Sequence, residues 1–112
     1  MKKIELTLTA RQLNTLVYTF TFTQKLYPKT RSEKVMKSIL EKLMIKIRKK
    51  HIDVQASLHT LFSKPKKCKF TFEYHEGDCL EQFLIIAENF SMNDYDRNAI
   101  LYIKNKINQQ LA

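Results

Sequence analysis

The chain has few of the residues that interrupt regular secondary structure. It contains one glycine, Gly77, and two prolines, Pro28 and Pro65. This scarcity excludes collagen, glycine-rich linkers and small β-barrels with many tight turns. It also excludes the glycine-rich loops that cradle phosphate groups, because those loops need several glycines in one stretch.

Long apolar runs and cysteines are scarce as well. No stretch approaches the ~18 uninterrupted apolar residues of a membrane span, and the basic N-terminus is not followed by the apolar segment of a signal peptide. The two cysteines, Cys68 and Cys79, do not make a disulfide framework. We therefore expect a protein of the reducing cytoplasm with no membrane partner.

The composition is that of a folded globular protein. Apolar residues make up 44% of the chain, charged residues 28% and aromatic residues 11%, which is not the composition of a disordered chain. The length fits one domain, residues 1–112, because two independent cores would each be too small to be stable. At this length folding buries roughly 65% of the surface of the extended chain, enough for a core without disulfides or metals.

The net charge of +9 is unevenly distributed. Residues 1–69 contain seventeen basic and four acidic side chains, whereas residues 70–112 contain three basic and seven acidic ones. Such a chain could attract a polyanion to its first two-thirds, or pair its basic part with the acidic part of another copy. Sixteen of the basic residues are lysines and four are arginines. Because arginine is the usual residue for bidentate recognition, a merely solvated basic surface is the alternative.

The first part of the chain predicts one strand and one helix. Residues 2–8 alternate between apolar and polar side chains, the pattern of a half-buried strand. Residues 10–26 have apolar side chains at helical spacing, and Thr9 and Gln12 form the sequence pattern of a capping box. Residues 15–23 also alternate and are rich in residues that favour strands, so a strand there is the alternative.

As a helix, residues 10–26 would be apolar on two sides. The stripe suited to the core consists of Leu13, Leu16, Val17 and Phe20. A second ridge on the far side consists of Tyr18, Phe22 and Leu26. A helix that is apolar on two sides is either deeply buried or contacts a partner. The second ridge is therefore a candidate interface.

The middle of the chain predicts two helices with a break between them. Ser32 is placed to cap a helix over residues 33–50, and Asp53 to cap a shorter helix over residues 54–63. The apolar stripe of the longer helix consists of Val35, Met36, Ile39, Leu40, Leu43 and Ile47. Ile45 falls on the opposite, charged face and is another candidate contact residue.

The last part of the chain predicts a second strand and two further helices. Residues 69–75 alternate and predict another half-buried strand. Gly77 and Asp78 are expected to form a turn and the cap of the next helix. Asp94 is expected to open a final helix over residues 95–111.

These patterns predict an α+β fold, a small helix-rich single domain in which two strands, about 2–8 and 69–75, pack against four to five helices. Because the order strand, helix, helix occurs at both ends, residues 1–50 and 68–112 are candidate pseudo-repeats, joined by a short helix and a basic loop. Two such repeats would pair their strands antiparallel. A two-stranded sheet has two open edges that invite a partner strand, so we expect a homodimer.

No pattern predicts catalytic residues, a metal or another cofactor. The nearest approach to a metal site is Cys68, His75 and Cys79, with His59 as a fourth group, but their spacing is not that of a zinc knuckle. Strand alternation also directs Cys68 inward and His75 outward, which argues against a Cys–His nucleophile pair as well. The nearby carboxylates fit a solvated helix N-terminus, and they are Glu73, Glu76, Asp78 and Glu81. We therefore expect no enzyme activity.

Two functions remain, and both act by binding. The first is a protein-interaction or assembly module that associates with itself, through the candidate interface residues Tyr18, Phe22, Leu26 and Ile45. The alternative is a nucleic-acid-binding accessory protein that holds phosphates without reading sequence. Its candidate residues are Lys46, Arg48, Lys49, Lys50, Lys64, Lys66, Lys67 and Lys69. These two clusters become neighbours if the short helix over residues 54–63 folds back.

Overall fold

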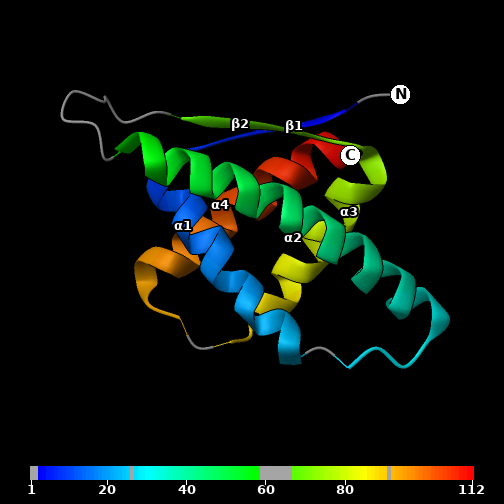
Figure 1. The fold of residues 1–112 in the computed structure, drawn as a ribbon. Helices are drawn as coiled ribbons and strands as arrows, with labels where there is room; N and C mark the ends of the chain where they lie inside the picture. Colours follow the sequence, from blue (N-terminus) through cyan, green and yellow to red (C-terminus); the bar gives the residue numbers. More distant parts are fainter. Residues whose placement is uncertain (1–2, 26, 59–66, 91) are drawn as a thin grey trace.

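The computed structural model of the chain describes residues 3–25, 27–58, 67–90 and 92–112. Within these residues it is a small helix-rich α+β domain with two strands and four α-helices, as predicted. The elements in chain order (Figure 1) are β1 (Ile4–Leu8), α1 (Ala10–Thr19), the 3₁₀-helix η1 (Phe20–Lys25), α2 (Arg31–Leu58), β2 (Cys68–Phe72), α3 (Tyr74–Ala87) and α4 (Asp94–Leu111).

The two strands form an antiparallel ribbon with Leu6 opposite Phe70 at its centre. Their side chains alternate strictly between the buried and the exposed face, as the sequence pattern predicts. The second strand ends earlier than predicted, at Phe72 rather than residue 75. Glu73 is the N-cap of α3 and shares a capping box with Glu76. Tyr74 therefore begins a helix and is 47% exposed, instead of facing the core.

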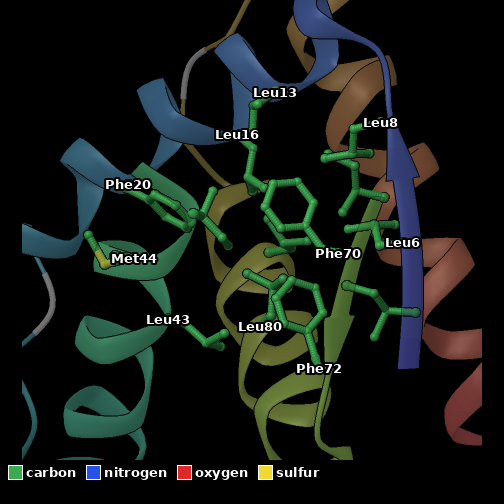
Figure 2. Close-up of a cluster of buried hydrophobic side chains, with 14 of the residues drawn as sticks. Leu6, Leu8, Leu13, Leu16, Phe20, Leu43, Met44, Phe70, Phe72 and Leu80 are labelled. Atoms are coloured by element: carbon green, nitrogen blue, oxygen red, sulfur yellow. The ribbon is translucent and has the colours of Figure 1, made fainter. Parts of the chain in front are cut away.

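The core lies between the buried face of the ribbon and the helices. Figure 2 shows Phe70 and Phe72 projecting from β2 toward Leu80 of α3, with Leu43 of α2 nearby. The fully buried large side chains are Phe20, Phe72, Phe83, Ile4, Leu6, Leu8, Leu13, Leu16, Leu43, Ile47, Leu80 and Leu84. Burial of each such side chain contributes roughly 1.5–3 kcal/mol, which is how a ribbon of two strands is held.

Residues 10–25 are helical, so the alternative strand over residues 15–23 is wrong. The predicted single helix changes type at Phe20, where α1 gives way to η1. The hydroxyl of Thr19 donates to the carbonyl four residues earlier, at 2.8 Å. The hydroxyls of Thr21 and Thr23 each donate to the carbonyl three residues earlier, also at 2.8 Å. These bonds satisfy the threonine hydroxyls within the helical turns, so that Thr19 is buried without an unpaired polar group.

A single helix, α2, replaces the two predicted over residues 33–50 and 54–63, as far as Leu58. Asp53 is exposed inside α2 and caps nothing there, whereas Val54 is buried and continues the apolar stripe. The predicted cap at Ser32 is also wrong. The helix is capped by Thr30, whose hydroxyl accepts the backbone N–H of Glu33 at 3.1 Å.

The length of α2 explains why its first turns are exposed. Its 28 residues span about 42 Å at 1.5 Å per residue, close to the longest dimension of the molecule, 49 Å. Its N-terminal part extends past the other helices at the lower right of Figure 1. Val35, predicted to be in the core, is consequently 54% exposed, and Met36 is only half-buried.

Gly77 lies inside α3 rather than in the predicted turn, and its φ is negative. Its role is a close approach between α3 and β1, because a Cβ at this position would lie 2.9 Å from Cγ1 of Ile4. The last helix, α4, has Asn93 as its N-cap, with the Asn93 side chain accepting from the N–H of Asp96 at 2.8 Å.

Side chains from two helices engage the outer edges of the ribbon. On the β1 edge, the Glu5 N–H donates to Oε1 of Gln110 at 2.7 Å, and Nε2 of Gln110 donates to the Glu5 carbonyl at 2.6 Å. On the β2 edge, Nζ of Lys46 donates to the Thr71 carbonyl at 2.9 Å. The predicted pair of open edges is therefore wrong at these positions, since helix side chains take the hydrogen bonds that another strand would make.

Candidate interaction surfaces

A row of lysines follows one side of α2 through the middle of the helix. Lys42, Lys46, Lys49 and Lys50 are exposed, and helical periodicity places them on one broad face. Lys46 contacts the β2 edge through Thr71. The positive charge of Lys50 acts on Cys68, the first residue of β2. This row of α2 therefore runs beside β2.

Two exposed lysines of the β2 segment, Lys67 and Lys69, extend this row. The Nζ of Lys69 lies 3.6 Å from a carboxylate oxygen of Glu5, on the solvent face of the ribbon. Exposed ion pairs of this kind contribute about 0–1 kcal/mol. We call Lys42, Lys46, Lys49, Lys50, Lys67 and Lys69 the basic ridge.

The predicted basic residues are only partly brought together. Lys46, Lys49, Lys50, Lys67 and Lys69 belong to the basic ridge, because α2 packs along β2. Of the helix expected to fold back, residues 54–58 continue α2, and residues 59–63 lie outside the described residues. Arg48 points to the opposite flank of α2, because a separation of two residues is about 200° around a helix. Lys64 and Lys66 lie outside the described residues. Lys42 was not among the predicted residues. Its position one helical turn before Lys46 indicates that the two lysines share a face of the helix.

An apolar groove lies between the projecting N-terminal half of α2 and the last turns of α3. It has a volume of about 150 Å³, and it is lined by Tyr27, Pro28, Glu33, Met36, Lys37, Leu40, Phe83 and Ile86. We call this the apolar groove. It exists because the core-facing stripe of α2 continues beyond the helices that would cover it. Tyr27 at this groove is 80% exposed, the highest value among the exposed large hydrophobic side chains of the described residues.

The predicted interface residues that the structure describes lie on α1, η1 and α2. Tyr18 and Ile45 are each 56% exposed, on α1 and α2 respectively. Phe22 is half-buried, with its ring 5.8 Å from that of Tyr18 and stacked at 4.8 Å on Phe90. Leu26 lies outside the described residues. The apolar groove was not predicted, because no local pattern reveals how far α2 extends past α3.

A polar depression of about 420 Å³ separates α1 from the N-terminus of α4. The guanidinium carbon of Arg11 lies 3.8 Å from the centre of the Tyr95 ring, and the Thr15 hydroxyl donates to Asp96 at 2.9 Å. Nearby, Nε2 of His51 and Oδ1 of Asn14 are 2.6 Å apart. These contacts hold α1 against α4 and α2, which is a sufficient structural reason for the polar residues here.

Both cysteines are free and buried. Burial raises the pKa of the Cys68 thiol, with the charge of Lys50 opposing it. Burial also raises the pKa of Cys79, and the carboxylates of Asp78 and Glu76 add to that effect. Thiols with a raised pKa are protonated at neutral pH and are poor nucleophiles and poor metal ligands.

The remaining groups considered for chemistry are either dispersed or outside the described residues. Across the described parts of the chain, no three His, Cys, Asp or Glu side chains are grouped so that they could hold a metal ion. His75 is exposed, and His59 is not among the described residues. The Glu76 carboxylate accepts the backbone N–H of Glu73 at 2.8 Å, which gives it a capping role.

Comparisons with known proteins do not add a family or a function. No family model, curated protein sequence or solved structure matches this chain. In the described residues, no helix combines the length and the apolar character needed to cross a membrane.

Proposed function

We propose that the protein is a non-enzymatic interaction module that associates with itself through its apolar end. The observation that carries this proposal is the apolar groove with Tyr27 exposed beside it. Ile85 and Ile86 of α3 and Val35 of α2 add exposed apolar surface at the same end. An aromatic anchor next to an apolar concavity is the usual centre of a protein interface.

The state of the ribbon edges bears on how association occurs. Gln110 already bonds the outward N–H and carbonyl of Glu5, and Lys46 bonds the outward carbonyl of Thr71. Addition of a partner strand would have to displace these side chains. Association through helices leaves them in place, so we propose a homodimer built on α2 and α3 rather than on the strands.

Sedimentation velocity on the full chain over a range of concentrations tests this proposal. We expect a monomer–dimer equilibrium that persists in high salt, because salt does not screen the burial of apolar surface. A dimer held by pairing of basic and acidic regions would instead weaken as salt is added. A chain that remains monomeric at high micromolar concentration in both low and high salt would refute self-association.

A second function is favoured by the basic ridge, namely binding of a nucleic-acid backbone. The continuity of α2 beside β2 supports it, because four lysines of the helix and two of the β2 segment then lie along one surface. Contacts of lysine to phosphate give affinity that falls steeply with salt and depends little on sequence. Lys46 is partly engaged by Thr71, so the other ridge lysines would supply most of the binding.

Fluorescence anisotropy with a generic DNA duplex and a generic RNA tests the basic ridge. The variant K42Q/K49Q/K50Q should bind more weakly. Its affinity should also fall less steeply with salt concentration, as expected for the loss of about three phosphate contacts. The control K29Q/R31Q/K34Q removes the same charge from exposed residues around the start of α2, and it should leave the slope close to wild type. Equal effects of the two variants, or no binding at low salt, would exclude this function.

We also propose that the chain consists of two related halves and resides in a reducing compartment such as the cytoplasm. Thr9 and Glu73, the caps of α1 and α3, are separated by the same number of residues as Ile4 and Cys68, which begin the strands. Buried helix positions recur at the same separation, as in Leu16 and Leu80. The two free, buried thiols fit the reducing compartment.

A further inference from the structure

The apolar groove and the most exposed large apolar side chain of the described residues are next to each other. The groove has room for a side chain, about 150 Å³, and its floor includes Leu40 and Phe83, which are buried in the core. Tyr27 lines the groove and yet is 80% exposed, so its ring projects from the rim. A projecting ring and a cavity therefore belong to one patch.

A patch that contains both a projection and a cavity suits a symmetric pair. In a two-fold contact the same surface is used by both copies, so a projection on one can enter the cavity of the other, and the reverse. A foreign partner would not require both features on this chain. This argument favours a second copy of the chain as the occupant of the groove.

The charged side chains on the lip of the groove point to the orientation. Glu33 and Lys37 are one helical turn apart on α2 and both line the groove. Within one chain this spacing already lets the two charges attract each other. If two copies of this segment lie antiparallel about an axis between these residues, Glu33 of each copy also comes opposite Lys37 of the other. A parallel arrangement would instead place like charges together. Glu33 is already oriented, because its Oε2 accepts the N–H of Lys29 at 2.9 Å.

We propose that two copies of the chain dock antiparallel along the N-terminal half of α2, each inserting Tyr27 into the apolar groove of the other. This rests on the proposed self-association and specifies its surface. Tyr27 is the buried anchor of the contact, and the Glu33–Lys37 pairs at its rim set the register. The basic ridge begins at Lys42, beyond the α2 residues that line the groove, so it stays outside the contact.

Charge reversal tests the orientation. The variants E33K and K37E each place like charges opposite one another twice in the pair, so each should dimerise roughly tenfold or more weakly than wild type. Mixing them pairs a chain that has a lysine at both positions with a chain that has a glutamate at both, which restores the two attractions. We expect sedimentation velocity to show a dimer in the mixture and monomers in each separate sample.

The anchor is tested by Y27S, with I52S as the matched control at the other end of α2, where Ile52 is also exposed. Y27S should weaken dimerisation by roughly tenfold or more, and I52S should not change it. Circular dichroism and urea unfolding establish that each variant is folded, and the mixing experiment is independent of damage within one chain.

The outcomes separate the two proposals. A wild-type chain that is strictly monomeric overturns both self-association and this docking mode. A wild-type dimer that is unaffected by Y27S, or whose charge variants do not recover on mixing, overturns the docking mode alone. Recovery on mixing together with loss in Y27S supports both.

Discussion

Substitution of Gly77 by alanine tests how closely α3 packs on β1. A Cβ at position 77 would lie 2.9 Å from Cγ1 of Ile4, 3.4 Å from its Cβ and 3.5 Å from its Cγ2. Ile4 is fully buried in the first strand, and its Cβ is fixed to the backbone of β1. The contact can therefore be relieved only by a change of the Ile4 rotamer or a shift of α3 away from the ribbon.

Two effects of opposite sign determine the result. Alanine stabilises a helix interior by about 1 kcal/mol relative to glycine. Overpacking of a filled core costs about 1–3 kcal/mol, and a contact with a branched, immobile side chain belongs in the upper part of that range. We therefore expect G77A to lower the free energy of unfolding by about 1–2 kcal/mol, and each kcal/mol corresponds to roughly 4–8 °C in Tm for a domain near this size.

Urea unfolding measures this change, and a second background isolates its cause. In an I4A chain the opposing side chain is gone, so G77A should become neutral or stabilising, with a coupling of at least about 1 kcal/mol between the two sites. S38A, on the exposed face of α2, is the control for helix propensity and should be neutral or slightly stabilising. Wild-type or higher stability of G77A would refute the close approach.

Three further predictions concern the ribbon edge, a helix cap and the thiols. Q110A removes the two hydrogen bonds to Glu5 and should cost about 1 kcal/mol in urea unfolding, with faster aggregation in light scattering; Q109A, on an exposed residue, should do neither. T9A breaks the capping box of α1 and should lower the free energy of unfolding by about 1 kcal/mol, whereas T9S should lower it little. Equal stability of T9A and T9S would contradict the capping role. Because the pKa values of Cys68 and Cys79 are raised in the folded state, the unfolded chain loses its thiol protons first as pH rises. The thiol contribution to stability should therefore be constant below about pH 8 and decline above about pH 8.5. Urea midpoints measured against pH should show this decline in the wild type, and C68A/C79A should lack it.

The elements with strong local signals were predicted correctly from sequence. The alternation in Ile4–Leu8 and Cys68–Phe72 reproduces the buried and exposed faces, and the Thr9–Gln12 pair forms the capping box it suggested. Cys68 is buried, as its place in the alternation predicted. These signals succeed because neighbouring residues alone decide them, through side-chain direction and the unpaired N–H groups at a helix start.

Errors occurred where a local signal competed with packing. Asp53 resembles a cap, but no glycine or proline interrupts residues 31–58, and burial of Val54 extends α2 through that position. Gly77 resembles a turn residue, but Glu73 already caps α3, and the glycine serves contact with Ile4. In both cases a residue suited to a chain reversal was used inside a helix.

The candidate surfaces show the same division. Lysine content near the end of α2 was evident from sequence, but its alignment with Lys67 and Lys69 depends on α2 packing along β2. The apolar groove follows from the projection of α2 past α3, and its lining comes from segments far apart in the chain. No periodicity within one segment can indicate such a junction.

By itself the sequence determined the number and type of most elements, their buried faces and the absence of flexible glycine-rich segments, because these depend on residue spacing and backbone freedom over a few positions. Only the tertiary structure decided that α2 continues through Asp53 to Leu58, which backbone groups of the strand edges bond to Gln110 and Lys46, and which apolar side chains stay uncovered. The physical reason is that a helix length and an exposed face are fixed by what packs against them, and that neighbour lies elsewhere in the chain.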